Sequence, residues 1–193
     1  MLIMEIGKYL SLEHFCTCTK TYTKYADQID PYPQNLDSIV AIQALNTYIL
    51  DPIIDHFGYD NFQLTYGFCS PDLKRFLNQK DPKTGVKNGR IDPSRDQHMA
   101  HEINRNGKYY CSRLGAACDF LILTVKSNEV IDWIISVKLP FDSLYYYGQT
   151  ASGSDRPIHI SYSRQHKKAL WAFTTKGTPT RKGTEKWQKA IKN

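Results

Sequence analysis

The longest regular pattern of apolar residues predicts a helix that begins after Asn35. Apolar side chains recur every three or four residues, at positions 36, 39, 42, 45, 49, 53 and 57, which is the spacing of one helical face. Asn35 is a suitable N-cap, and Gly58 suits the position just beyond the C-terminus. Because Pro52 lies inside the pattern, we expect the helix to kink or divide there. We interpret this helix as scaffold.

Three shorter helices are predicted from their capping residues. Ser70, which is followed by a proline and an acid, begins a helix that runs through residue 77. Ser94 and Gln97 have the spacing of a capping box, so a short helix is expected over residues 95–107. Ser127 caps a third helix, whose apolar residues stand at positions 130, 131, 134 and 135.

Five segments have the composition of β-strands. Residues 119–125 are the strongest of these, because they are densely apolar and bounded by turn formers. The others are residues 62–66, 141–147, 158–163 and 169–173. Helices and strands in this order predict an α+β fold, with helices flanking a small, mostly antiparallel sheet.

The remaining segments are expected to be irregular. Residues 7–18 are interpreted as an initial strand or loop, and the polar residues 22–33 as a loop. Residues 78–93 are rich in turn formers and lack periodicity, which predicts an exposed loop. A chain of 193 residues is most simply one domain. We place this domain at residues 1–175, followed by a basic C-terminal tail at residues 176–193.

The positive charge of the chain is concentrated at its C-terminal end. The net charge is +6, but residues 164–193 hold nine Lys or Arg and one acid, a balance of +8, which leaves −2 for residues 1–163. Trp171, Phe173 and Trp187 lie among these basic residues. Such a surface could bind the phosphates and bases of nucleic acid, or an anionic cell-wall polymer. The alternative is a last strand followed by a solvated tail, and no specific nucleic-acid motif is present.

The sequence predicts a cytoplasmic protein in reducing surroundings. It has no run of about 18 apolar residues, so no membrane-spanning segment is expected. The first residues lack the basic start and the cleavage site of a signal peptide. Five cysteines, an odd number without C-x-x-C spacing, favour free thiols over disulfides. Cys16 and Cys18 have a weak metal-ligand spacing, and we favour a structural role for them.

Two histidines and one aspartate are candidate ligands of a single metal ion. Asp119 begins the strongest predicted strand, and His159 alternates with isoleucines along another, so its side chain points away from theirs. His98 lies in the second of the short helices, with His101 three residues later on the same face. Zinc accepts imidazole nitrogen and carboxylate oxygen, so these side chains could hold zinc. Taken singly, each is more simply explained as an ordinary hydrogen-bonding residue.

Two short motifs carry a family resemblance. Residues 115–119 are Gly-Ala-Ala-Cys-Asp and residues 158–161 are Ile-His-Ile-Ser. They match the G-x-A-x-D and I/W-H-[IV]-S pieces of the M15 family of zinc D-alanyl-D-alanine carboxypeptidases and phage endolysin peptidases, which have the Hedgehog/DD-peptidase fold. Residues around them follow a similar order, namely Phe15, Asn35-Leu36, Leu50-Asp51-Pro52, Phe57-Gly58 and residues 64–68. The resemblance covers about residues 12–165.

The resemblance implies this fold, together with a zinc ion held by His98, Asp119 and His159. It also implies hydrolysis of an amide bond by metal-bound water, with a peptidoglycan cross-peptide as the first-choice substrate. A phage origin would fit the resemblance, and a phage-derived enzyme would be released to act on the cell wall.

The chain departs from the family pattern at three positions. Ser112 stands where the first ligand would fall, so we infer an insertion at about residues 100–112. His98, in a Gln-His-Met piece that is similar to the family's S-Q-H, then becomes the first ligand, with His101 as its substitute. Cys69 stands in place of the family's substrate-clamping arginine, and a thiol does not hold a carboxylate as a guanidinium does.

The third departure concerns the family's general base, a Glu or Asp shortly before the last histidine. The expected acid falls near Tyr147. Asp155, four residues before His159, or Glu102, beside the histidine pair, would have to serve instead. Tyr147 and Arg113 are our candidates for contacts to the substrate. The ligand pattern is therefore retained, whereas the residues that bind and cleave a D-alanyl peptide are altered.

The sequence leaves two functions to be weighed. The first is a monomeric zinc hydrolase that acts on a peptide or cell-wall substrate. The second is a nucleic-acid-associated protein that keeps the fold and metal site and acts on, or merely binds, DNA or RNA through its basic C-terminal end. The retained ligands favour the first function, and the altered clamp and base positions favour the second.

Overall fold

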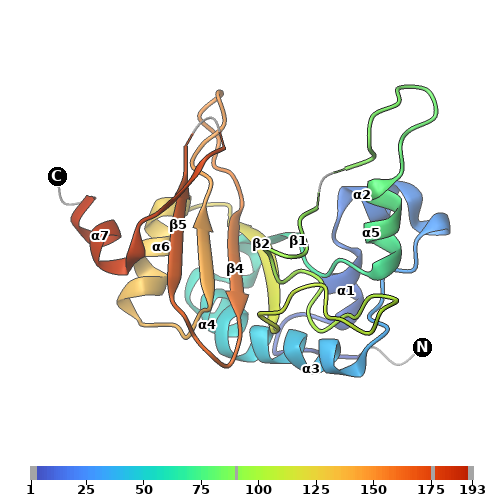
Figure 1. Ribbon diagram of the computed structural model, residues 1–193. Helices are drawn as coiled ribbons and strands as arrows, with labels where there is room; N and C mark the ends of the chain where they lie inside the picture. Colours follow the sequence, from blue (N-terminus) through green and yellow to red (C-terminus); the bar gives the residue numbers. More distant parts are fainter. Residues whose placement is uncertain (1–3, 90, 175–176, 191–193) are drawn as a thin grey trace.

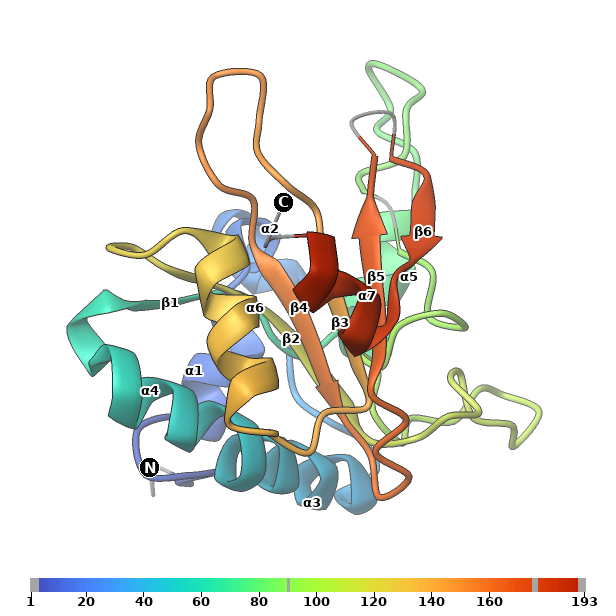
Figure 2. The same ribbon diagram turned by 90° about the vertical axis from the view of Figure 1, so that its left-hand side faces the viewer.

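A six-stranded sheet organises the fold (Figures 1 and 2). The computed structural model describes residues 4–89, 91–174 and 177–190, except the side chains of residues 186 and 188–190. In spatial order the strands are β1 (Phe62–Tyr66), β2 (Ala116–Ile122), β4 (Ile158–Tyr162), β3 (Ser143–Tyr146), β5 (Ala169–Phe173) and β6 (Pro179–Arg181). All neighbouring strands are antiparallel except β3 and β5, which are parallel. The α+β class and the mostly antiparallel sheet are confirmed.

Helices lie on both sides of this sheet. They are α1 (Leu12–Thr17), α2 (Lys20–Tyr25), α3 (Leu36–Leu45), α4 (Asp51–Phe57), α5 (Pro71–Asn78), α6 (Ser127–Ser136) and α7 (Gly183–Ala190), with short turns η1 (Ala26–Gln28), η2 (Asn46–Leu50) and η3 (Tyr59–Asn61). Figure 1 shows α1, α2 and α5 on one side of the sheet and α6 and α7 on the other. Among the described residues, no helix has the length and apolar character needed to cross a bilayer.

The two faces of the sheet carry different side chains because strand residues alternate. One face is apolar and packs against α6; it includes Phe120, Ile158, Ile160, Leu144 and Leu170. The other face carries Asp119 of β2, His159 of β4 and Tyr145 of β3, which are partners across the strands. The strand pattern therefore separates a hydrophobic core from a polar face on which a site can be built.

The helix predicted after Asn35 is confirmed, and it divides directly before Pro52. The helices α3, η2 and α4 follow one another over residues 36–57. The Asn35 side chain accepts a hydrogen bond from the N–H of Asp37 at 3.0 Å, and Gly58 ends the helix with a φ of +88°. A turn of π-helix, η2, precedes Pro52. Because proline has no N–H to donate, this wider turn places it among the first residues of α4, where no partner is needed.

The helices predicted after Ser70 and from Ser127, and all five predicted strands, are also present. Ser70 accepts a hydrogen bond from the N–H of Leu73 at 3.0 Å. Ser127 is the first residue of α6 and not its cap, because Lys126 holds the N-cap position without a side-chain hydrogen bond. The strand β2 begins three residues earlier than predicted, so Asp119 lies inside it and not at its start.

Several local predictions are wrong. Residues 7–18 contain the helix α1, and residues 22–33 overlap α2 and η1. The helix predicted at residues 95–107 is replaced by turns. Gln97, expected as part of a capping box, is buried and instead donates a hydrogen bond to the carbonyl of Leu114 at 2.5 Å. A tertiary contact has therefore overridden the local helix signal.

The C-terminal stretch contains more structure than a tail would. The strand β6 pairs with β5, and the helix α7 follows it. Trp187 of α7 is 6% exposed and donates a hydrogen bond to Asp132 of α6 at 2.7 Å. The domain boundary expected between residues 175 and 176 lies outside the described residues, so it stays a prediction.

Candidate metal centre

Three titratable side chains meet on the polar face of the sheet. Nδ1 of His159 lies 2.9 Å from Oδ1 of Asp119 and 3.2 Å from Nε2 of His98. That Nε2 lies 3.4 Å from the same carboxylate oxygen. Both histidines are buried, whereas the Asp119 side chain is 25% exposed. These three residues, here called the triad, form a group whose ligand atoms converge closely enough to hold a metal ion.

Strand register places two members of the triad. Asp119 and His159 are direct partners in the antiparallel β2–β4 pair, so their side chains share a face with Cβ atoms about 5 Å apart. The register depends on Gly115, which precedes β2 with a φ of +84°. An added Cβ at Gly115 would lie 2.1 Å from the carbonyl oxygen of Tyr162, so only glycine allows this close approach.

His98 is brought to the triad by irregular backbone. Its carbonyl accepts a hydrogen bond from the N–H of Cys69 at 2.9 Å. Its Nδ1 lies 2.8 Å from the carbonyl oxygen of Gly67 and must donate, because a carbonyl only accepts. An added Cβ at Gly67 would lie 2.1 Å from the carbonyl oxygen of Phe15. The backbone after β1 therefore fixes the ring and leaves Nε2 facing the triad.

The donor set fits a tetrahedral metal ion such as zinc. Zinc bonds of about 2.0–2.1 Å in tetrahedral geometry place ligand atoms about 3.3 Å apart. The three distances within the triad, 2.9, 3.2 and 3.4 Å, are close to this value. Nε2 of His159 is buried and finds no hydrogen-bond partner among the described residues. This ring is held instead by Tyr145, which stacks on it with centroids 4.4 Å apart.

The charges of the three triad residues strongly shift one another's pKa values. Burial alone would raise the pKa of Asp119, but the two histidines, chiefly through the charge of His98, hold it well below its usual range. Burial alone would lower the pKa of His98, but Asp119 and then Asp96 raise it to about 9. Burial lowers the pKa of His159. Without a metal ion, the triad therefore holds one imidazolium, one carboxylate and one neutral imidazole.

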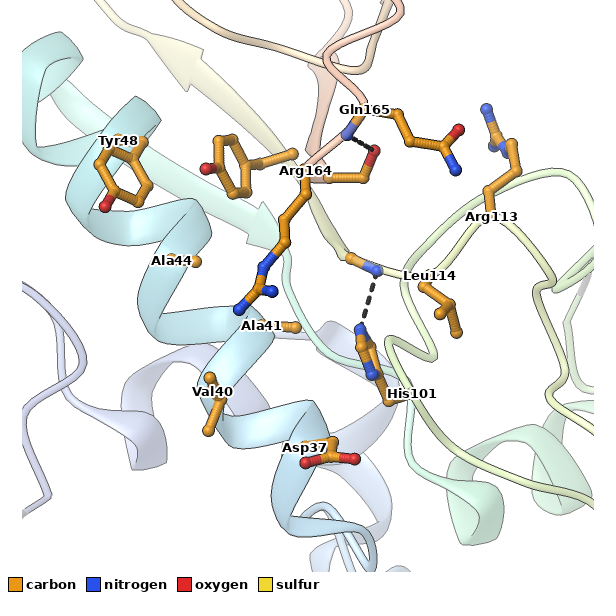
Figure 3. Close-up of a pocket in the computed structure, with 13 residues that line it drawn as sticks. Asp37, Val40, Ala41, Ala44, Tyr48, His101, Arg113, Leu114, Arg164 and Gln165 are labelled. Carbon is orange, nitrogen blue, oxygen red and sulfur yellow. Dashed lines mark hydrogen bonds between the residues drawn. The ribbon is translucent and has the colours of Figure 1, made fainter.

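The alternative ligand His101 does not join the triad. Its Nε2 accepts a hydrogen bond from the N–H of Gly115 at 3.0 Å (Figure 3). Its ring lines a separate pocket between α3 and the residues that follow β4, opposite Arg164. Burial, the largest influence, lowers the pKa of His101, which suits its role as a neutral acceptor.

The two candidate bases, Glu102 and Asp155, are engaged elsewhere. Glu102 accepts hydrogen bonds from the hydroxyl of Ser38 at 2.8 Å and from the N–H of Asn35 at 3.1 Å. Asp155 accepts one from the N–H of Ser127 at 2.9 Å. Each carboxylate thus lies at a helix N-terminus, of α3 and α6 respectively, where negative charge is favourable. Neither is hydrogen-bonded to the triad within the described part of the chain.

A cleft of about 610 Å³ opens beside the triad. Tyr147 and Arg113, the expected substrate contacts, both line it. Two further lining residues connect it to the triad: Tyr145 stacks on His159, and Asp96 accepts a hydrogen bond from the N–H of His98 at 3.3 Å. Sequence reasoning missed the roles of Asp96 and Tyr145. Alternation along residues 141–147, which puts Tyr145 and Tyr147 on one face of a strand, was the available signal for Tyr145.

The cysteines in the C-x-C spacing fit a structural role. Burial raises the pKa of both thiols, that of Cys18 to about 11, so neither is a thiolate, the form that binds metal.

The fold and the site together define a mixed α+β protein with a buried His-Asp-His triad that could hold a metal ion. Compared with protein-family models, curated proteins and solved structures, the chain matches none.

Proposed function

We propose that the chain is a metal-dependent hydrolase whose triad holds one zinc ion. The observation that carries the proposal is the convergence of two imidazole nitrogens and one carboxylate oxygen within 3.4 Å of one another. Catalytic zinc sites typically have three protein ligands and an open fourth position. When bound, zinc lowers the pKa of a coordinated water and polarises a carbonyl group.

Residues of the chain would orient the ligands and admit the substrate from one side. Gly67 fixes His98 through Nδ1, and Tyr145 holds His159 by stacking. Asp119 is the exposed member of the triad, so the open side lies next to it. Burial raises the pKa of Tyr147, and the negative charge of Asp119 raises it further. Its phenol therefore stays protonated and would donate a hydrogen bond to a substrate in the cleft.

Amide hydrolysis of the M15 type is the reaction we infer, with a peptidoglycan cross-peptide as the first substrate to test. The support is that the two motif pieces supply Asp119 and His159, which lie together. A Hedgehog/DD-peptidase-like fold belongs to the same proposal. The departures lower the expected rate. Cys69 is buried with its thiol pKa raised to about 12, and Glu102 would have to leave its partners in order to transfer a proton.

The proposal is tested by incubating the zinc-loaded chain with cross-linked peptidoglycan fragments and measuring new amino groups by mass spectrometry. We expect slow release by the natural chain and by His101→Gln, and a loss of at least about 100-fold in Asp119→Asn, which removes a charged zinc ligand. Equal release by Asp119→Asn, or no product from the zinc-loaded natural chain, would contradict the proposal.

A further inference from the structure

One row of paired residues crosses the whole sheet and includes two triad members. Neighbours in the row are partners in strand register, so their side chains share one face. The row consists of Tyr66, Asp119, His159, Tyr145, Trp171 and Arg181. The triad and the outer strands β5 and β6 therefore lie on the same face of the sheet, with His159 buried beneath Tyr145. The cleft beside the triad lies at the β3–β5–β6 end of this face.

Aromatic rings form one part of the cleft. Along β5, Leu170 and Ala172 turn to the core, so Trp171 and Phe173 turn to the cleft. Phe173 packs on Tyr147 with ring centroids 4.6 Å apart. Among the described residues, Trp171 stacks on no other ring, and it is only partly buried. Trp171 thus presents a flat apolar surface that a ligand ring could cover.

Guanidinium groups form the other part. The cleft is lined by Arg95, Arg113 and Arg156, against two acids, Asp92 and Asp96. Arg95 pairs with Asp92 at 3.2 Å, and Arg113 pairs with the buried Asp142 at 3.9 Å. Arg156 makes no ion pair within the described part of the chain. Arg156 therefore brings to the cleft a positive charge that no ion pair neutralises within the described residues.

Arg181 of β6 adds a further positive charge at the edge of the cleft. It is the strand partner of Trp171, is exposed and lies on the same face. A cation beside a free indole ring suits a ligand in which an anionic group follows each flat ring. A neutral glycan would not need the guanidinium groups, and a peptide terminus would use only one of them.

We propose that this cleft binds single-stranded nucleic acid, with a base stacked on Trp171 and phosphates held by Arg156 and Arg181. The binding uses the sheet surface and not a free basic tail, because Trp187 is buried against Asp132 and Tyr146. It does not require the metal ion, although the row of paired residues would place the bound strand next to the triad.

The test is the binding of a fluorescein-labelled oligodeoxythymidine of about 12 nucleotides, a length within the usual site sizes. Fluorescence anisotropy would be measured with zinc-loaded and with metal-free chain. Two phosphate contacts predict a slope of about −1.4 in the logarithm of affinity against that of salt, which is about sevenfold weaker binding at 200 mM than at 50 mM. We expect similar affinity with and without zinc.

Matched variants separate the cleft from the rest of the surface. Trp171→Leu is expected to weaken binding about tenfold or more, because a stacked base is lost. Arg156→Gln should weaken binding and flatten the salt dependence by almost one unit. Tyr59→Leu, which removes an exposed aromatic ring, and Arg105→Gln make comparable changes outside the cleft lining and should bind normally. Circular dichroism checks that each variant is folded.

Each outcome decides the proposal. Absence of oligonucleotide binding overturns it, as does binding that the two cleft variants leave unchanged. Binding of an acidic cell-wall polymer in the cleft, with no oligonucleotide binding, overturns it in favour of a different polyanion. Oligonucleotide binding without hydrolysis of any substrate would support the cleft assignment and count only against the hydrolase.

Discussion

His98 is the residue at which protons and metal ions compete most directly. Its Nε2 faces the triad, and Asp119 raises its pKa to about 9 despite burial. At neutral pH the metal-free chain therefore carries a proton that a metal ion must displace. Because Asp119 keeps its negative charge, the proton on His98 stabilises the empty triad.

Zinc affinity should consequently depend on pH. We expect it to rise by about tenfold per pH unit up to about pH 9 and then to level off, with about one proton released per ion bound at pH 7.5. Titration calorimetry in buffers of different ionisation enthalpy measures the released protons. Zinc binding at pH 7.5 without proton release would show that His98 is not a ligand.

The metal-free fold should respond to pH in the opposite direction. The pKa of His98 in the folded chain is about 9, above the ordinary value of 6.5. Its contribution to stability is therefore complete below about pH 6.5 and is lost as the pH rises to about 9. The melting temperature of the metal-free chain should fall across this range, and much less so in His98→Ala.

Glu102 illustrates a residue whose chemistry the sequence could not assign. Its position beside the histidines favoured a catalytic base, but its carboxylate binds Ser38 and Asn35 at the start of α3. We expect Glu102→Ala to lower the free energy of unfolding by about 1.5–3 kcal/mol while leaving zinc affinity within about twofold. Chemical denaturation and zinc titration measure the two effects. A large loss of zinc affinity with unchanged stability would contradict this structural role.

At the scale of elements, the strands and capped helices were predictable because each carries its signal locally. Alternation along residues 158–161 placed His159 opposite its isoleucine neighbours, and the pairing of β2 with β4 then brought it to Asp119. The 92–115 segment was not predictable. It has no regular structure that a local pattern could report, and His98 is held there by backbone contacts to residues distant in sequence, Gly67 and Cys69.

Gln97 is expected to position the 92–115 segment on the sheet. Its side chain is buried, donates to Leu114 at 2.5 Å and to Asp142 at 3.2 Å, and directly precedes His98. Replacing it by methionine, which is similar in size but forms neither hydrogen bond, should weaken zinc binding about tenfold with the fold retained. Ser94→Ala, an exposed change in the same segment, is the matched control. Equal affinities in the two variants would contradict this positioning role.

At the scale of the whole molecule, the uneven charge has a structural counterpart. The excess positive charge lies after residue 163 of the sequence. The fold shows that one of these basic residues, Arg181, lies on the same face of the sheet as the triad. Trp171 of β5 and Arg181 of β6 lie on the face of the sheet that carries the triad. Trp187 holds α7 against α6 through its hydrogen bond to Asp132. The C-terminal stretch therefore contributes both to the core and to the surface beside the site.

Metal content tests the central claim most directly. The purified chain, dialysed against zinc and then against zinc-free buffer, should retain about one ion per chain by mass spectrometry. His98→Ala, Asp119→Ala and His159→Ala should each lose the ion, whereas His101→Ala should keep it. A natural chain without zinc after this treatment, or one that loses zinc only in His101→Ala, would contradict the account.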